Sequence, residues 1–150
     1  MIRNILLLCT GNVCRSPMAE GLLREWLPAH EIFSAGLCAL EGAPADRLAL
    51  ELMWQSGIDI SEHRARNLAS WMMREADLVL TMDNAQRQFV IRRYPVVSKK
   101  VERLGDLCDL DIPDPYQHGL AAFCHSLRLI ERALQSRLPV LTRGSACSLH

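Results

Sequence analysis

The sequence lacks a long apolar run. None of its stretches approaches the ~18 consecutive apolar residues that a membrane-spanning helix needs. The apolar stretch near the N-terminus, residues 4–9, is much shorter than the core of a secretory signal, and no small-residue cleavage pattern follows it. We therefore predict a cytoplasmic protein that does not insert into membranes.

The sequence also lacks a net charge, because its 17 lysines and arginines balance its 17 aspartates and glutamates. A neutral chain has no general attraction for nucleic acid or for anionic membranes, so neither is an expected partner. Any site for an anion must therefore be built locally, from a few well-placed groups.

Neither a C-x-x-C pair nor a nucleotide-binding loop is present. The six cysteines are predicted to be thiols, because a cytoplasmic protein experiences reducing conditions. The pairs Cys9/Cys14 and Cys124/His125 are poorly spaced for zinc, so we predict no metal and no cofactor. The patterns G-x-x-x-x-G-K-[ST] and G-x-G-x-x-G are both absent, which excludes the common nucleotide cradles.

Apolar patterning predicts strands that alternate with helices in one domain, residues 1–150, without repeats or linkers. Ser16 is the expected N-cap of a first helix that begins at Pro17, and Gly57 is expected to end the second helix. Such alternation implies a parallel sheet with helices on both faces, where ligands bind at the carboxyl ends of the strands. The predicted strands are residues 4–9, 31–36, 77–82 and 100–105, and the predicted helices are residues 17–27, 43–57, 69–76, 84–94 and 119–138.

Residues 9–16, CTGNVCRS, join the first strand to the first helix. Free N–H groups at a helix N-terminus attract an anion. Gly11 and Asn12 tolerate the left-handed backbone that would turn further amides inward. Arg15 adds a planar fork of donors suited to two oxygens of a tetrahedral oxyanion. This loop is therefore predicted to bind a phosphate-like group.

Cys9 gives the same loop a nucleophile. A cysteine is mostly protonated at neutral pH unless its surroundings favour the thiolate. The amides, the helix dipole and Arg15, which attract an anion, also stabilise a thiolate. Alone, Cys9 would suit a packing role and Arg15 a solvated one. Their combination on the two sides of a Gly-Asn pair indicates a catalytic site.

The pattern C-x5-R-S-P at residues 9–17 resembles the low-molecular-weight protein tyrosine phosphatases, as do SAG at 34–36, ADLVLTM at 76–82 and DPY at 114–116. The resemblance covers essentially the whole chain. It implies a flavodoxin-like, doubly wound fold with a four-stranded parallel sheet, and hydrolysis of phosphotyrosine through a cysteinyl-phosphate intermediate without metal. It also implies phosphotyrosine-containing proteins as substrates and, as for some bacterial members, a partner tyrosine kinase linked to polysaccharide export.

Four aspartates crowd the late loop, residues 105–118. Asp114 differs from the others because Pro113 and Pro115 stiffen the chain around it, which allows its carboxyl group to be aimed. Phosphoryl transfer needs an acid that protonates the leaving group. The resemblance places that acid at the Asp of D-P-aromatic, which is Asp114 in this sequence.

Further residues are assigned around Cys9, Arg15 and Asp114. Tyr116 can present a flat face to a phenyl ring, with residues 37–42, and Leu40 in particular, as the candidate opposite wall. Val13 is a branched aliphatic residue, as in the tyrosine-specific relatives, whereas arginine phosphatases of the family carry threonine there. Cys14 is a candidate partner that traps the oxidised nucleophile as a disulfide.

The loop amides are expected to hold the phosphoryl oxygens. Within the loop, Asn12 is assigned to maintaining its shape and the Ser16 hydroxyl to donating to the thiolate. His63 and His118 are expected to be structural or solvated. The phosphate-binding residues are Thr10, Gly11, Asn12, Val13, Cys14, Arg15 and Ser16, and the cysteines assigned structural roles are Cys38, Cys108, Cys124 and Cys147.

Three alternatives remain open. A thiol-dependent arsenate reductase on this fold needs two further cysteines close together near the third strand, and residues 76–100 contain none. A non-catalytic phosphate-binding module requires neither Cys9 nor Asp114. A protein-arginine phosphatase shares the fold and the loop.

Overall fold

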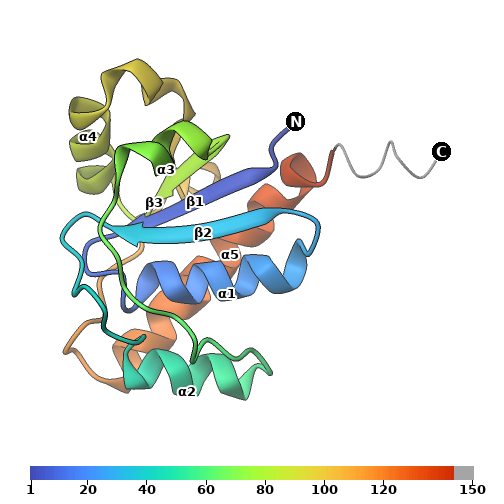
Figure 1. Ribbon diagram of the computed structural model, residues 1–150. Helices are drawn as coiled ribbons and strands as arrows, with labels where there is room; N and C mark the ends of the chain where they lie inside the picture. The colour runs from blue at the N-terminus through green and yellow to red at the C-terminus, as the bar shows by residue number, and fades with distance from the viewer. Residues whose placement is uncertain (144–150) are drawn as a thin grey trace.

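The computed structural model, which describes residues 1–143, is a four-stranded parallel sheet between two layers of helices (Figure 1). The sheet order β2-β1-β3-β4 places the first strand in the interior, beside β2 and β3. This arrangement confirms the predicted fold class. The strands are β1 (Asn4–Cys9), β2 (Glu31–Gly36), β3 (Leu78–Thr81) and β4 (Val101–Arg103).

Strand β1 is buried because its side chains are apolar on both faces of the sheet. Side chains alternate along a strand, so Leu6 and Leu8 pack in one core cluster, whereas Ile5, Leu7 and Cys9 pack in the other. The alternation therefore directs Cys9 toward the layer that contains the first helix.

Helices cover both faces of the sheet. Figure 1 shows α1, α2 and α5 on one face and α3 and α4 on the other. Two short 3₁₀ helices flank β4. The helices are α1 (Arg15–Trp26), α2 (Arg47–Gln55), α3 (Ser70–Glu75), α4 (Asn84–Arg93) and α5 (Leu120–Leu141), and the 3₁₀ helices are η1 (Pro95–Lys100) and η2 (Asp106–Cys108).

Three helix ends differ clearly from the prediction. The second helix begins at Arg47 rather than at residue 43, because the Asp46 side chain caps it by accepting from the backbone N–H of Leu48. The first helix begins at Arg15 rather than Pro17, and Ser16 is not its N-cap, because the buried Ser16 side chain bonds to other groups. The last helix continues through Pro139 to Leu141. Leu141 is buried in the core, and its packing holds the last turn although a proline removes one backbone donor. Gly57 follows the second helix with φ of 78°, as a C-terminal glycine should.

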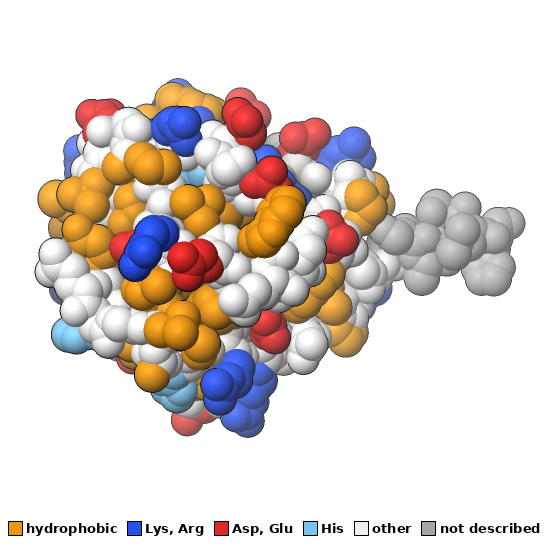
Figure 2. All heavy atoms as spheres, turned by 90° about the horizontal axis from the view of Figure 1, so that it is seen from below, with side chains coloured by type: hydrophobic (Ala, Val, Ile, Leu, Met, Phe, Trp, Pro, Cys, Tyr) orange, Lys and Arg blue, Asp and Glu red, His pale blue; other side chains and the backbone are white. Residues whose placement is uncertain are grey.

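The surface agrees with the balanced composition. Seen from below, the face over α2 shows charges of both signs among apolar side chains (Figure 2). Each helix within residues 1–143 is too short or too polar to span a lipid bilayer. Cys147 lies outside the described residues.

Candidate active site

The site lies where β1 ends. Cys9 is the last residue of the strand, and the chain then curves back to start α1 at Arg15. The Sγ atom of Cys9 lies 2.9 Å from the Ser16 hydroxyl and 3.4 Å from the Ser16 backbone nitrogen. This backbone N–H is one of the free donors of the first helical turn, so the helix start faces the sulfur.

Asn12 determines the direction of the Ser16 hydroxyl. The Asn12 side-chain amide donates to Ser16 Oγ over 2.8 Å and to Ser34 Oγ over 3.1 Å. Because Ser16 Oγ accepts this bond, its own proton is available for Cys9 Sγ. The Cys9 sulfur therefore faces two donors, the Ser16 hydroxyl and the Ser16 backbone N–H.

The loop backbone is left-handed at Asn12 but not at Gly11. Asn12 adopts the left-handed conformation, with φ of 58°, and its side-chain oxygen accepts from the backbone of Arg66. Gly11 tolerates the same conformation but does not adopt it, because its φ is not positive. One left-handed residue is enough to turn the loop, because Asn12 is tied to three neighbouring segments through its side chain.

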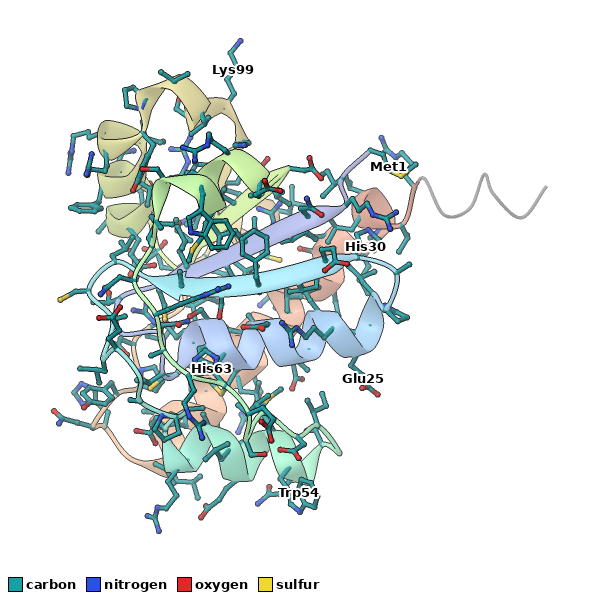
Figure 3. The ribbon with its side chains drawn as sticks, in the orientation of Figure 1. Met1, Glu25, His30, Trp54, His63 and Lys99 are labelled. Atoms are coloured by element: carbon teal, nitrogen blue, oxygen red, sulfur yellow. The ribbon has the colours of Figure 1, made fainter. Side chains whose placement is uncertain are left out.

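His63 supports the loop from behind. Its Nε2 atom lies 2.7 Å from the carbonyl oxygen of Asn12, so this nitrogen carries the proton and donates it. Its Nδ1 atom lies 4.0 Å from the carboxylate of Glu20. Figure 3 shows His63 below α1, on the chain that follows α2. These contacts are those of a structural histidine, as predicted.

Arg15 is almost fully buried at the other end of the loop. Its Nη1 atom donates to the carbonyl of Ile112 over 2.9 Å and lies 3.3 Å from a carboxylate oxygen of Asp83. Its Nη2 atom lies 3.7 Å from Asp114 Oδ2. The guanidinium therefore joins the first loop to the late loop, as the topology of the sheet predicts.

Asp83 is a site residue that the sequence reasoning missed. It lies two residues after the end of β3 and caps α4, where its side chain accepts from the backbone of Gln86. The available signal was its position after a buried strand, because the carboxyl ends of parallel strands meet at one edge.

Asp114 occupies the tip of the late loop, and about half of its side chain is exposed. One carboxylate oxygen accepts from the backbone of Tyr116, and the other faces Arg15. The Ser126 hydroxyl donates to the carbonyl of Pro113 over 2.7 Å and anchors the loop to α5. An anchored, half-exposed carboxyl group can reach a leaving group at the pocket mouth.

A pocket of about 170 Å³ brings most of the predicted residues together. Leu40 and Tyr116 both line it, as the two-wall hypothesis requires. Cys38, predicted to be structural, is exposed and also lines the pocket. Asn12 and Ser16 are buried and do not line the pocket; the Ser16 hydroxyl bonds to Cys9 Sγ, and the Asn12 side chain bonds to Ser16. The lining residues are Cys9, Thr10, Gly11, Val13, Cys14, Arg15, Cys38, Leu40, Asp114 and Tyr116.

Cys14 shares the pocket but differs from Cys9 in its electrostatics. Burial, reinforced by the charges of Asp46 and Cys9, raises the pKa of the Cys14 thiol far above its usual value. Arg15 opposes this effect without overcoming it. Cys14 therefore stays a protonated thiol at neutral pH, which makes it a poor nucleophile.

A larger hollow of about 470 Å³ lies between α1 and the segment 57–66. Its lining contains Glu20, Ser34 and His63, which support the loop from behind, but neither a cysteine nor Asp114. The smaller pocket is therefore the candidate active site, because it alone of the two combines a thiol, a guanidinium and an acid.

Comparisons with known proteins agree with this geometry. The family described as low molecular weight phosphotyrosine protein phosphatase matches residues 4–145. A relative from Ralstonia nicotianae, named "Probable low molecular weight protein-tyrosine-phosphatase EpsP", is 48% identical over 139 residues, 93% of this chain and 96% of that protein.

Solved structures show the same fold. The tyrosine phosphatase AmsI of Erwinia amylovora has a TM-score of 0.89 at 35% identity, over 93% of each chain. The YwlE arginine phosphatase of Geobacillus stearothermophilus has a TM-score of 0.88 at 30% identity, over 99% of this chain and 97% of that chain.

Proposed function

The chain belongs to the low molecular weight phosphotyrosine protein phosphatase family, and on that basis we propose that Cys9, Arg15 and Asp114 carry out its hydrolysis of phosphotyrosine. The protein is a phosphoric monoester hydrolase whose substrates are phosphoproteins. The observation that carries the residue assignment is the Cys9 sulfur, which receives the Ser16 hydroxyl and backbone N–H inside a pocket that Arg15 and Asp114 also line.

In the first step, the Cys9 thiolate attacks phosphorus in line with the bond to the phenolic oxygen. The S–P bond forms as the P–O bond breaks, and Asp114 transfers its proton to the departing oxygen. Arg15 and the amides of residues 10–16 hold the equatorial oxygens as charge redistributes among them.

In the second step, Asp114 acts as a base. Its carboxylate accepts a proton from water, the water oxygen bonds to phosphorus, and the S–P bond breaks. Phosphate leaves, and Cys9 is again a thiolate that Ser16 stabilises. The cycle returns every group to its starting protonation state without a cofactor.

The pocket walls favour an aromatic leaving group. Leu40, Val13 and Tyr116 offer apolar surface beside the cradle, which suits a phenyl ring. A phosphoarginine would instead bring a polar guanidinium against these side chains, and burying it without partners costs free energy. The aliphatic Val13 therefore favours phosphotyrosine over phosphoarginine, despite the similarity to an arginine phosphatase.

The proposal extends to the cellular context. Bacterial relatives such as EpsP and AmsI lead us to propose a cytoplasmic enzyme that opposes a cognate tyrosine kinase linked to polysaccharide export. Phosphotyrosine-containing proteins, including that kinase, would be its substrates.

Hydrolysis of p-nitrophenyl phosphate, with and without EDTA, tests the proposed function. We expect turnover that EDTA leaves unchanged, because the mechanism uses no metal. Activity confined to arsenate with added thioredoxin would instead identify an arsenate reductase. Binding of phosphate without any turnover would identify a non-catalytic module.

Cys14 adds a redox proposal to the same site. Hydrogen peroxide would oxidise the Cys9 thiolate to a sulfenic acid and release hydroxide, which takes a proton from solvent to become water. The Cys14 thiol would then attack that sulfur, forming the disulfide and releasing a second water. Cys14 lines the same pocket and stays a thiol at neutral pH, so peroxide acts first on Cys9.

This redox role predicts that Cys14→Ala recovers poorly from peroxide. The parent should regain most of its activity with dithiothreitol, whereas Cys14→Ala should regain only a small part, because unprotected Cys9 oxidises further. Cys124→Ala, on α5, is the matched control and should recover like the parent. Equal recovery of Cys14→Ala and the parent would refute the role.

A further inference from the structure

Gln86 lies in the first turn of α4 and is almost fully buried. Its side-chain oxygen accepts from the backbone of Met82 over 2.9 Å, and its side-chain nitrogen donates to Thr10 Oγ1 over 3.1 Å. The Met82 N–H can only donate, so it fixes which end of the Gln86 amide carries the oxygen. The amide nitrogen must therefore face Thr10.

This contact determines what the Thr10 hydroxyl can do. A hydroxyl has one proton to donate, and the Gln86 amide occupies part of its accepting side. The proton must point away from Gln86. Thr10 is an exposed residue that follows Cys9 and lines the pocket. The pocket is therefore one direction in which the hydroxyl is free to donate.

Gln86 also reaches the opposite end of the loop. Its backbone N–H donates to Asp83 Oδ1 over 2.8 Å, and Asp83 Oδ2 lies 3.3 Å from Arg15 Nη1. The start of α4 thus contacts the phosphate loop at Thr10 directly and at Arg15 through one carboxylate. A helix end that contacts both Thr10 and Arg15 can hold the phosphate loop, residues 9–16, in its binding conformation before the substrate arrives.

We propose that the Thr10 hydroxyl is an additional donor to a phosphoryl oxygen and that Gln86 is the positioning residue that aims it. The inference rests on the proposed function, since the bound oxyanion is the phosphoryl group. It adds one side-chain donor to the backbone amides and Arg15.

The test measures the dissociation constant of tungstate, a tetrahedral oxyanion, by isothermal titration calorimetry. Thr10→Val should weaken binding about tenfold, which is the loss of one hydrogen bond to a charged group. Thr10→Ser keeps the hydroxyl and should stay within about twofold of the parent. This rescue separates hydrogen bonding from side-chain packing.

Gln86→Met and Gln86→Glu test the positioning role. Gln86→Met removes the donor and should weaken tungstate binding about fivefold, since the hydroxyl remains but is no longer aimed. In Gln86→Glu the carboxylate would accept the Thr10 proton, so binding should weaken at least as much. Gln88→Met, on an exposed position of the same helix, should bind like the parent.

A double substitution tests the coupling between the two residues. Thr10→Val with Gln86→Met should bind tungstate as weakly as Thr10→Val alone, because Gln86 acts through the hydroxyl. The proposal would be overturned if the double variant weakened tungstate binding by the product of the two single effects. Unchanged tungstate binding in Thr10→Val would also overturn it. Thermal unfolding verifies that each variant is folded. If Gln86→Met does not fold, the tungstate affinity of Gln86→Glu tests the positioning role instead.

The outcome is separable from that of the proposed function. Tungstate binding needs no turnover, so the series stays informative if the parent fails to hydrolyse p-nitrophenyl phosphate. That failure would remove the proposed function. Conversely, a fully active parent with unchanged tungstate binding in Thr10→Val would remove only the role of the hydroxyl.

Discussion

Cys9→Ser should abolish hydrolysis of p-nitrophenyl phosphate, with a loss of at least about four orders of magnitude in kcat. In the proposed mechanism the Cys9 thiolate attacks phosphorus, and a serine hydroxyl at the same position is a much weaker nucleophile. Binding of phosphate analogues should persist, because the loop amides and Arg15 remain. Steady-state kinetics and calorimetry with tungstate measure the two effects separately.

The control for this variant is Cys124→Ser, which makes the same chemical change on α5 and should keep the activity of the parent. Iodoacetate should inactivate the parent by alkylating Cys9, and tungstate should slow that reaction. Appreciable turnover by Cys9→Ser, or full activity after alkylation of Cys9, would contradict the assignment of the nucleophile.

Asp114→Ala should slow phenyl phosphate far more than p-nitrophenyl phosphate. Phenolate is a poor leaving group that needs a proton as it departs, whereas p-nitrophenolate departs readily without one. General acid catalysis contributes about 10²–10⁴ in rate. We therefore expect a loss in kcat within that range for phenyl phosphate and a clearly smaller loss for p-nitrophenyl phosphate.

Asp109→Ala is the matched control for the acid. Asp109 lies on the same loop, is 98% exposed and pairs with Arg103 rather than Arg15. Its substitution should leave both substrates unaffected. If Asp114→Ala slowed the two substrates equally, the leaving group would not depend on Asp114, and the acid would have to be sought elsewhere.

Much of the fold follows from local pattern. The apolar run of β1 and the alternation of elements identify a parallel sheet, because burial on both faces and the helical period are written into neighbouring residues. Gly57 is likewise a local signal, because a glycine that follows a helix can adopt the left-handed conformation that ends it. The last helix extends beyond its predicted end at residue 138, because the packing of Leu141 outweighs the locally unfavourable Pro139.

In the candidate site, too, local sequence predicts some features and tertiary packing sets the others. Cys9 and Arg15 belong to one loop, and the prolines beside Asp114 mark a stiff tip, so the chemistry is visible in short segments of the chain. The groups that hold these residues in place cannot be seen in short segments of the chain. Ser16 has the sequence context of a helix cap, but burial and the amide of Asn12 turn it toward the sulfur.

The sequence by itself predicted the candidate nucleophile, the candidate anion-binding loop, the candidate acid and the order of strands and helices. Only the tertiary structure decided that Asp83 pairs with Arg15, that Gln86 bonds to Thr10 and that His63 supports Asn12. The physical reason is range. Turn chemistry and apolar period depend on residues close in the chain, whereas a side-chain hydrogen bond depends on which distant loops the folded sheet brings to one edge.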